Sequence, residues 1–164
     1  MMELPETLTL ARQLEETVRG ARILAIDIAE KRPKFLFTNE DLGAWGRKPI
    51  KAFLVHEGNV CGIGNGYLQD ILHRAKLSPK RKVSTPDRRE QDRPHRAILD
   101  TMSSASARGG RDTEKDLFGA PGRYVPVLDR RAPGTPCPDC GVLIQKISFL
   151  GGWCYVRPRC QPAP

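Results

Sequence analysis

The sequence has no apolar run that approaches the ~18 residues needed to cross a bilayer. Its N-terminus also lacks the basic segment followed by an apolar one that is typical of a secretory signal. It contains no internal repeat and no low-complexity tract. We therefore expect a cytoplasmic protein without membrane contacts, and the length of 164 residues favours one ordinary domain or two small ones.

An even set of cysteines that would suggest a disulfide framework is also missing, because the chain has five. In a reducing compartment, metal ligation or free thiols are expected instead. Acidic residues are in deficit, with 19 Asp and Glu against 27 Lys and Arg, for a net charge of +8. Such an excess favours a polyanionic partner, with nucleic acid as the leading class, although a basic composition can also serve solubility alone.

The first part of the chain predicts one helix and two short strands. Apolar residues recur at helical spacing over Leu4–Val18, and a glycine follows. Residues 23–28 and 35–37 alternate β-branched or aromatic residues with polar ones, and Pro33 separates the two runs. Two short strands are marginally stable alone, so this sheet is small.

The middle of the chain predicts mainly helix. A short helix over residues 50–57 and a second over residues 67–75 flank a wide glycine-rich turn. A basic connector then leads to a longer polar helix over residues 87–107, in which Pro94 either kinks the helix or marks its start. Residues 111–136 are rich in proline and glycine and predict a loop, with one short helical turn near Leu117.

The turn before the second of these helices is a candidate phosphate site. Gly62, Gly64 and Gly66 surround Ile63 and Asn65 directly before the predicted helix. Glycines allow close backbone approach, and the amides at a helix N-terminus attract anions. Taken alone, such a motif is more often a simple turn than a phosphate site.

The cysteines near the C-terminus form a candidate zinc site. Cys137 and Cys140 lie two residues apart in a Pro- and Gly-containing knuckle, and Cys160 follows near the end of the chain. Arg157 stands where a second Cys-x-x-Cys pair would have its first sulfur. Cys154 is the candidate fourth ligand, with water as the alternative, and a metal-free hairpin with free thiols is the competing interpretation.

Together these segments resemble the formamidopyrimidine-DNA glycosylase and endonuclease VIII family. Met2-Glu3-Leu4-Pro5-Glu6 is similar to the family's Pro-Glu-Leu-Pro-Glu opening. The glycine-rich turn and the helix after it look like the family's helix-two-turn-helix signature, and residues 109–112 with 137–161 look like the lead-in and zinc finger. The order and spacing of all three match, which is more specific than any one of them.

The resemblance implies roles for individual residues. Members excise an oxidised base flipped out of the duplex and then cleave the abasic strand through a Schiff base on an N-terminal proline. Glu3 matches the carboxylate that shuttles the proton, Glu6 matches the second acidic residue, and Lys34 resembles a lysine that contacts the phosphate beside the lesion. Asn65, with Gly64 beside it, matches the asparagine that binds backbone phosphate.

Several features depart from the family pattern. Position 2 is Met2, so the proline nucleophile is absent, and Trp153 lies in the region where the finger arginine is expected. Between residues 39 and 51 the family would carry most of an N-terminal β-sandwich, for which this chain has only about a dozen residues. No segment matches the loop that fills the gap left by the flipped base.

The sequence thus predicts an α+β protein in three parts. These are a reduced N-terminal glycosylase-type domain over residues 1–47, a helix-two-turn-helix domain over 48–132, and a zinc-finger-like β-hairpin over 133–164. A DNA glycosylase and abasic-site lyase is the first functional hypothesis; a damaged-DNA-binding protein without excision, or a remnant without activity, are the alternatives. We expect a nucleoid-associated monomer that binds damaged double-stranded DNA, with Arg88 and Arg89 adding sequence-independent affinity.

Overall fold

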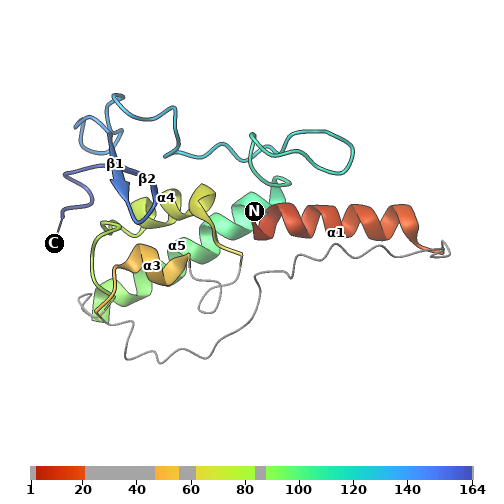
Figure 1. Cartoon of the computed structure of the whole chain (residues 1–164), viewed down its shortest axis with the longest axis horizontal. Helices are drawn as coiled ribbons and strands as arrows, with labels where there is room; N and C mark the ends of the chain where they lie inside the picture. Colours follow the sequence, from red (N-terminus) through yellow and green to blue (C-terminus); the bar gives the residue numbers. More distant parts are fainter. Residues whose placement is uncertain (1–2, 21–46, 56–61, 84–87, 164) are drawn as a thin grey trace.

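The computed structural model describes residues 3–20, 47–55, 62–83 and 88–163, with the backbone alone over 88–91. These ranges form helices followed by one antiparallel two-stranded sheet, an α+β arrangement (Figure 1). In chain order the elements are α1 (Leu4–Val18), α3 (Ile50–Leu54), α4 (Asn65–Arg74), α5 (Arg88–Ala107), β1 (Gln145–Phe149) and β2 (Gly152–Val156). The strands expected at residues 23–28 and 35–37 lie outside the described residues, and the predicted domain boundaries stay predictions.

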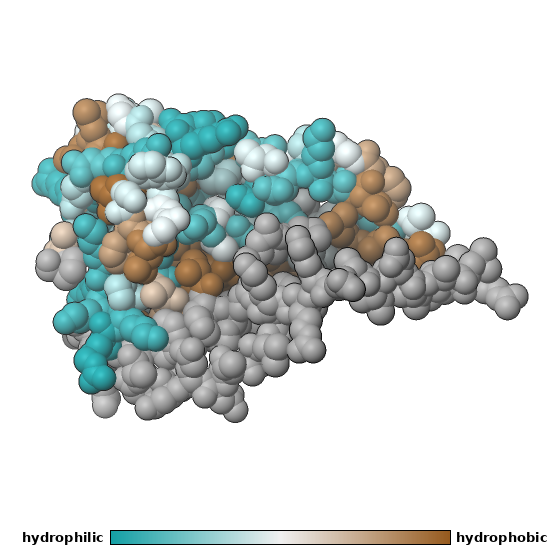
Figure 2. All heavy atoms as spheres, viewed as in Figure 1, coloured by the Kyte–Doolittle hydropathy of each residue, from teal (hydrophilic) through white to brown (hydrophobic). Residues whose placement is uncertain are grey.

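Helix α1 has the bounds that the sequence predicts, but polar contacts hold it in place. The side chains of Leu8, Leu14 and Val18 are about half exposed, and Figure 2 shows hydrophobic spheres over this helix. The helix instead buries Glu6 and Gln13. The Gln13 Nε2 donates to Asp116 Oδ2 at 2.9 Å, and Gln13 Oε1 accepts from the amide of residue 117 at 3.0 Å, so α1 is tied to the loop after α5.

Helix α4 forms the centre of the core, between α5 and the hairpin. Its apolar residues are almost completely buried with those of α3 and α5, and the main ones are Tyr67, Leu68, Ile71, Leu72, Ala97, Met102 and Ala105. Asp70 of the same helix accepts hydrogen bonds from the Tyr124 hydroxyl at 2.8 Å and from the amides of Val127 and Leu128 at 3.0 and 2.8 Å. One carboxylate therefore fixes the connector to the hairpin.

The predicted helix bounds in this region are close to those observed. Helix α4 begins at Asn65, two residues earlier than expected, and α5 runs over 88–107 with Pro94 inside it. Helix α3 ends at Leu54, three residues earlier than expected. The helical turn expected near Leu117 is wrong, because residues 111–136 contain no helix and Asp116 instead accepts the amides of residues 118 and 120 in a turn.

The C-terminal hairpin pairs β1 with β2 in a register that sets its two faces. Cys154 and Val156 are buried on one face. Trp153 and Tyr155 lie on the other face with Lys146 and Ser148 across from them. Among the described residues, no helix has both the length and the apolar character to cross a membrane.

Candidate nucleic-acid interface

The N-terminus of α4 is capped by a side chain from the start of the chain. Glu3 accepts hydrogen bonds from the amides of Gly64 at 3.2 Å, Gly66 at 2.9 Å and Tyr67 at 3.2 Å. The first amides of a helix have no partner within it, and a carboxylate satisfies both them and the helix dipole. The phosphate contact predicted for Gly64 must therefore use a group other than its amide, whose acceptor is Glu3.

A buried cluster around Arg111 completes this junction. Glu6 Oε1 accepts from the Tyr67 hydroxyl at 2.6 Å and from the amide of Arg111 at 3.1 Å. The Arg111 guanidinium lies 3.5 Å from Glu3 and 3.6 Å from Glu6. Burial raises the pKa of Glu3 above its usual value, while Arg111 and the amides of Gly66 and Gly64 act in the opposite direction. A Cβ at Gly66 would overlap the Arg111 guanidinium and lie 2.6 Å from Glu3 Oε1, so a side chain there would displace this cluster.

These contacts bear on the predicted catalytic residues. The carboxylates of Glu3 and Glu6 are both 5% exposed, and both join α1 to α4 and to the segment after α5. Their role in proton transfer stays a prediction that the contacts do not test. Lys34, the third candidate, lies outside the described residues.

Lys51 and Asn65 converge on the tip of the hairpin. The Lys51 ammonium is buried in α3 and donates to the carbonyl of Phe149 at 2.6 Å. A Cβ at Gly152 would lie 3.2 Å from Asn65 Nδ2 and 3.4 Å from Lys51 Nζ, so both groups lie against the turn between the strands. Asn65 itself is exposed. A cation, an amide donor and a glycine backbone thus come together at one place, which is a chemistry suited to a phosphate group.

Gln69, one turn further along α4, holds β2 against this helix. Its Nε2 donates to the carbonyl of Trp153 at 3.3 Å, and its Oε1 accepts from the amide of Tyr155 at 3.2 Å. Beside these contacts lies a cavity of about 480 Å³, and its lining includes Asn65, Gln69, Arg111, Arg130, Trp153 and Tyr155. The N-terminal half of α4 and one face of the hairpin therefore line the same cavity.

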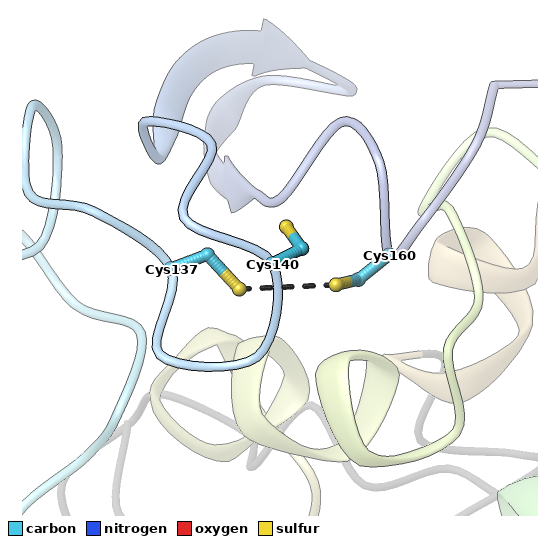
Figure 3. Close-up of side chains that lie close together, drawn as sticks. All are labelled: Cys137, Cys140 and Cys160. Atoms are coloured by element: carbon cyan, nitrogen blue, oxygen red, sulfur yellow. Dashed lines mark hydrogen bonds between the residues drawn. The ribbon is translucent and has the colours of Figure 1, made fainter.

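Three of the predicted zinc ligands lie together. The Sγ atoms of Cys137, Cys140 and Cys160 are all within 4.8 Å of one another, and those of Cys137 and Cys160 are 3.8 Å apart (Figure 3). Cys154 is not in this group; it lies on β2, buried opposite Ile147. Burial opposes ionisation of Cys137, but hydrogen bonds from the amides of Asp139 and Cys140 and from the neighbouring thiols lower the pKa of its thiol.

Arg157, which directly follows β2, is a buried cation. Its Nη1 donates to Asp139 Oδ2 at 3.1 Å and to His73 Nε2 at 2.8 Å, and its amide donates to Gln161. Burial and the Arg157 charge lower the pKa of His73 to about 4, so the imidazole is neutral and its Nε2 acts as acceptor. An arginine that cannot ligate zinc thus links the finger to α4.

Sequence reasoning did not single out Lys51, Arg111 or His73. The sequence offers one indication for Lys51, which lies between the apolar residues Ile50 and Leu54 on a short helix. A lysine is rarely buried unless it is paired, so one on an apolar helix marks a candidate functional residue. The partners of Arg111 and His73 are distant in sequence, so no local pattern reveals them. The backbone of Arg88 and Arg89 begins α5, and their side chains lie outside the described residues.

A glycine-rich helix-two-turn-helix beside a cysteine-bearing hairpin defines the class of this fold. The family model described as the formamidopyrimidine-DNA glycosylase H2TH domain matches residues 24–116, more than half of the chain. The chain therefore belongs to the formamidopyrimidine-DNA glycosylase family, as the resemblance of its motifs predicted.

Individual relatives agree with this assignment. Formamidopyrimidine-DNA glycosylase of Desulforamulus reducens is 35% identical over 123 residues, which cover 71% of this chain and 43% of that protein. The enzyme of Pelotomaculum thermopropionicum is 33% identical over 151 residues, covering 88% and 53%. The chain spans about half the length of these curated relatives.

Solved structures of the family share the fold. Lactococcus lactis Fpg, in a complex with DNA containing an abasic site, has a TM-score of 0.65 and 28% identity, covering 71% of this chain and 44% of that one. MutM (Fpg) of Thermus thermophilus has a TM-score of 0.62 and 29% identity, covering 70% and 45%.

Proposed function

We propose that this chain is a DNA-repair protein of the base-excision class that binds damaged duplex DNA at the nucleoid. The observation that carries the proposal is the convergence of Lys51, Asn65 and the hairpin turn at Gly152. Phosphate contacts fix the register of a protein on a duplex, and these groups come from three separate elements, α3, α4 and the hairpin. Solved relatives bound to DNA with an abasic site or a Fapy-dG lesion support the same partner.

Within this class, the first candidate activity is that of a DNA glycosylase and abasic-site lyase, by membership of the family. The second candidate is binding of damaged DNA without excision. One observation favours the second: position 2 is Met2, where the family has the proline nucleophile.

The binding proposal predicts a loss of affinity in Asn65→Ala. The side chain is exposed, so the change leaves the core intact, while a phosphate loses one donor. We expect binding to an abasic-site duplex to weaken about 5- to 10-fold, corresponding to one hydrogen bond with a net contribution of about 1 kcal/mol. Fluorescence anisotropy measures it. Ser103→Ala, a change in an exposed polar side chain of α5 away from Asn65, is the control, and equal affinity of Asn65→Ala and the wild type would contradict the assignment.

Trapping with borohydride separates the two candidate activities. A lyase that works through an imine becomes covalently linked to abasic DNA when the imine is reduced, whereas a binding protein does not. If the wild type forms the covalent protein–DNA complex and Lys34→Met forms it equally well, the imine is on an amine other than that of Lys34. Absence of trapping, together with retained duplex affinity, leaves binding without excision as the function.

We also propose that Cys137, Cys140 and Cys160 hold a zinc ion. Tetrahedral zinc with Zn–S bonds of about 2.3 Å places sulfurs about 3.8 Å apart, and the separation of Cys137 and Cys160 is 3.8 Å. When bound, zinc would supply a structural cross-link between the knuckle and the end of the chain.

Metal content and one gain-of-ligand variant test this site. We expect one zinc per chain by native mass spectrometry, and loss of zinc in Cys140→Ser. Arg157→Cys offers a fourth sulfur and should slow transfer of zinc to a chromophoric chelator by at least about tenfold. Cys154→Ala should change neither quantity, because Cys154 is not in the cysteine group. Loss of zinc in Cys154→Ala would instead show that Cys154 is a zinc ligand.

A further inference from the structure

One face of the hairpin carries two aromatic side chains: Trp153 is exposed, and Tyr155 packs in part against the small apolar cluster of Leu128, Ala132 and Ile144. Residues Lys146, Ser148, Trp153 and Tyr155 share this face through the strand register. Trp153 is 54% exposed, and Tyr155 is half-buried at the edge of the cavity described above. An exposed tryptophan with a tyrosine two residues away on the same strand forms a flat apolar surface, which in a small protein calls for an occupant.

This face is held rigidly. The two hydrogen bonds of Gln69 bind the backbone of β2 at Trp153 and Tyr155, and the buried Cys154 fixes the strand from the opposite side. The backbone that carries both rings is therefore fixed relative to α4 before any ligand arrives. A preorganised aromatic surface loses little conformational freedom when a planar ligand stacks on it.

The surroundings of the rings are mainly cationic. Arg130 lines the same cavity, and the Lys146 ammonium lies over the Trp153 ring, 3.9 Å from its centre. Arg111 also lines the cavity, but its guanidinium is already paired with Glu3, Glu6 and Glu114. The one carboxylate in the lining, Asp129, forms an ion pair with Arg131 at 2.6 Å. A ligand that suits this surface is planar, aromatic and attached to negative charge, which describes a nucleotide.

We propose that Trp153 and Tyr155 form a stacking platform for an unpaired nucleobase of a DNA strand whose phosphate lies at Lys51 and Asn65. The inference rests on the proposed function for the phosphate position. Asn65 borders the same cavity as both rings, so one nucleotide can reach both places. Bases inside a duplex already stack on their neighbours, so the platform selects DNA with an unstacked base, as at a gap, a flap or a lesion.

Intrinsic fluorescence tests the proposal in the full chain. Trp45→Phe removes the other tryptophan and leaves Trp153 as the reporter. An oligothymidylate of about eight nucleotides, within the usual site size for single strands, should quench this fluorescence, and an abasic oligomer of equal length should not. Trp153→Ala should lower oligothymidylate affinity about tenfold with an unchanged salt dependence, and Trp153→Phe should retain most of the affinity.

A matched aromatic change provides the control. Phe118 is 70% exposed on the loop after α5 and is not part of this cavity, so Phe118→Ala should bind oligothymidylate like the wild type. Equal affinity for oligothymidylate and the abasic oligomer, or full affinity in Trp153→Ala, overturns the platform while duplex binding stays intact. Absence of binding to every DNA overturns the platform and the proposed function together.

Discussion

Replacing Glu3 by alanine should destabilise the protein more than any other single change proposed for it. The variant leaves three amides at the start of α4 without their acceptor and leaves Arg111 with one buried partner fewer. Breaking a buried ion pair from one side costs about 3–5 kcal/mol, because the remaining charge stays buried. That is a large share of a typical stability of about 5–15 kcal/mol. Urea unfolding followed by circular dichroism measures the change.

Two companion variants make this result specific. Glu3→Gln keeps one acceptor oxygen and loses the charge, so its free energy of unfolding should lie between those of the wild type and Glu3→Ala. Glu16→Ala removes an exposed carboxylate of α1 whose ion pair with Arg12 is also exposed, and it should change the free energy by less than about 0.5 kcal/mol. A Glu3→Ala protein as stable as Glu16→Ala would show that the junction between α1 and α4 contributes little.

Lys51→Met should produce the largest loss of DNA affinity. The change keeps an apolar stem of similar length in the buried position and removes the ammonium that lies under the hairpin turn. We expect affinity for an abasic-site duplex to fall by at least about tenfold, as for the loss of a hydrogen bond to a charged group. The slope of log affinity against log salt should also decrease by about one, because one phosphate is no longer neutralised. Anisotropy titrations at several salt concentrations give both values.

The loss of charge needs its own control. Arg19→Met removes an equal charge at the end of α1 that lies far from the hairpin, so its effect on affinity and salt slope should be small (Figure 1). Lys51→Arg retains the charge and should recover part of the affinity. If Lys51→Met and Arg19→Met bind DNA equally well, the buried ammonium does not contact phosphate and only supports the carbonyl of Phe149.

Local patterns in the sequence predicted most of the helices and the hairpin. Helical spacing of apolar residues predicted the bounds of α1, and glycines marked the start of α4 within two residues. They did not predict that Leu8 and Leu14 would be about half exposed while Gln13 is buried. That outcome depends on the loop at Asp116, which lies 103 residues further along the chain and supplies the partner of Gln13.

In the candidate site too, local patterns predicted some features, and others depend on residues far apart in the sequence. The cysteine spacing predicted the grouping of Cys137, Cys140 and Cys160 but also suggested Cys154, which the strand register directs to the buried face. The glycine-rich turn predicted a DNA phosphate at the start of α4, which stays a prediction, whereas the fold places the carboxylate of Glu3 on these amides. Burial and long-range partners decide such cases, and neither is visible in a window of a few residues.

The direct test of the central claim is a salt titration of the purified chain with a labelled duplex that contains one abasic site. If the start of α4 and the hairpin turn together hold the phosphate backbone, affinity is measurable in dilute buffer. It then falls linearly with salt on logarithmic axes, with a slope of about −0.9 for each neutralised phosphate. A chain that is folded by circular dichroism and shows no binding to this duplex at low salt would contradict the claim.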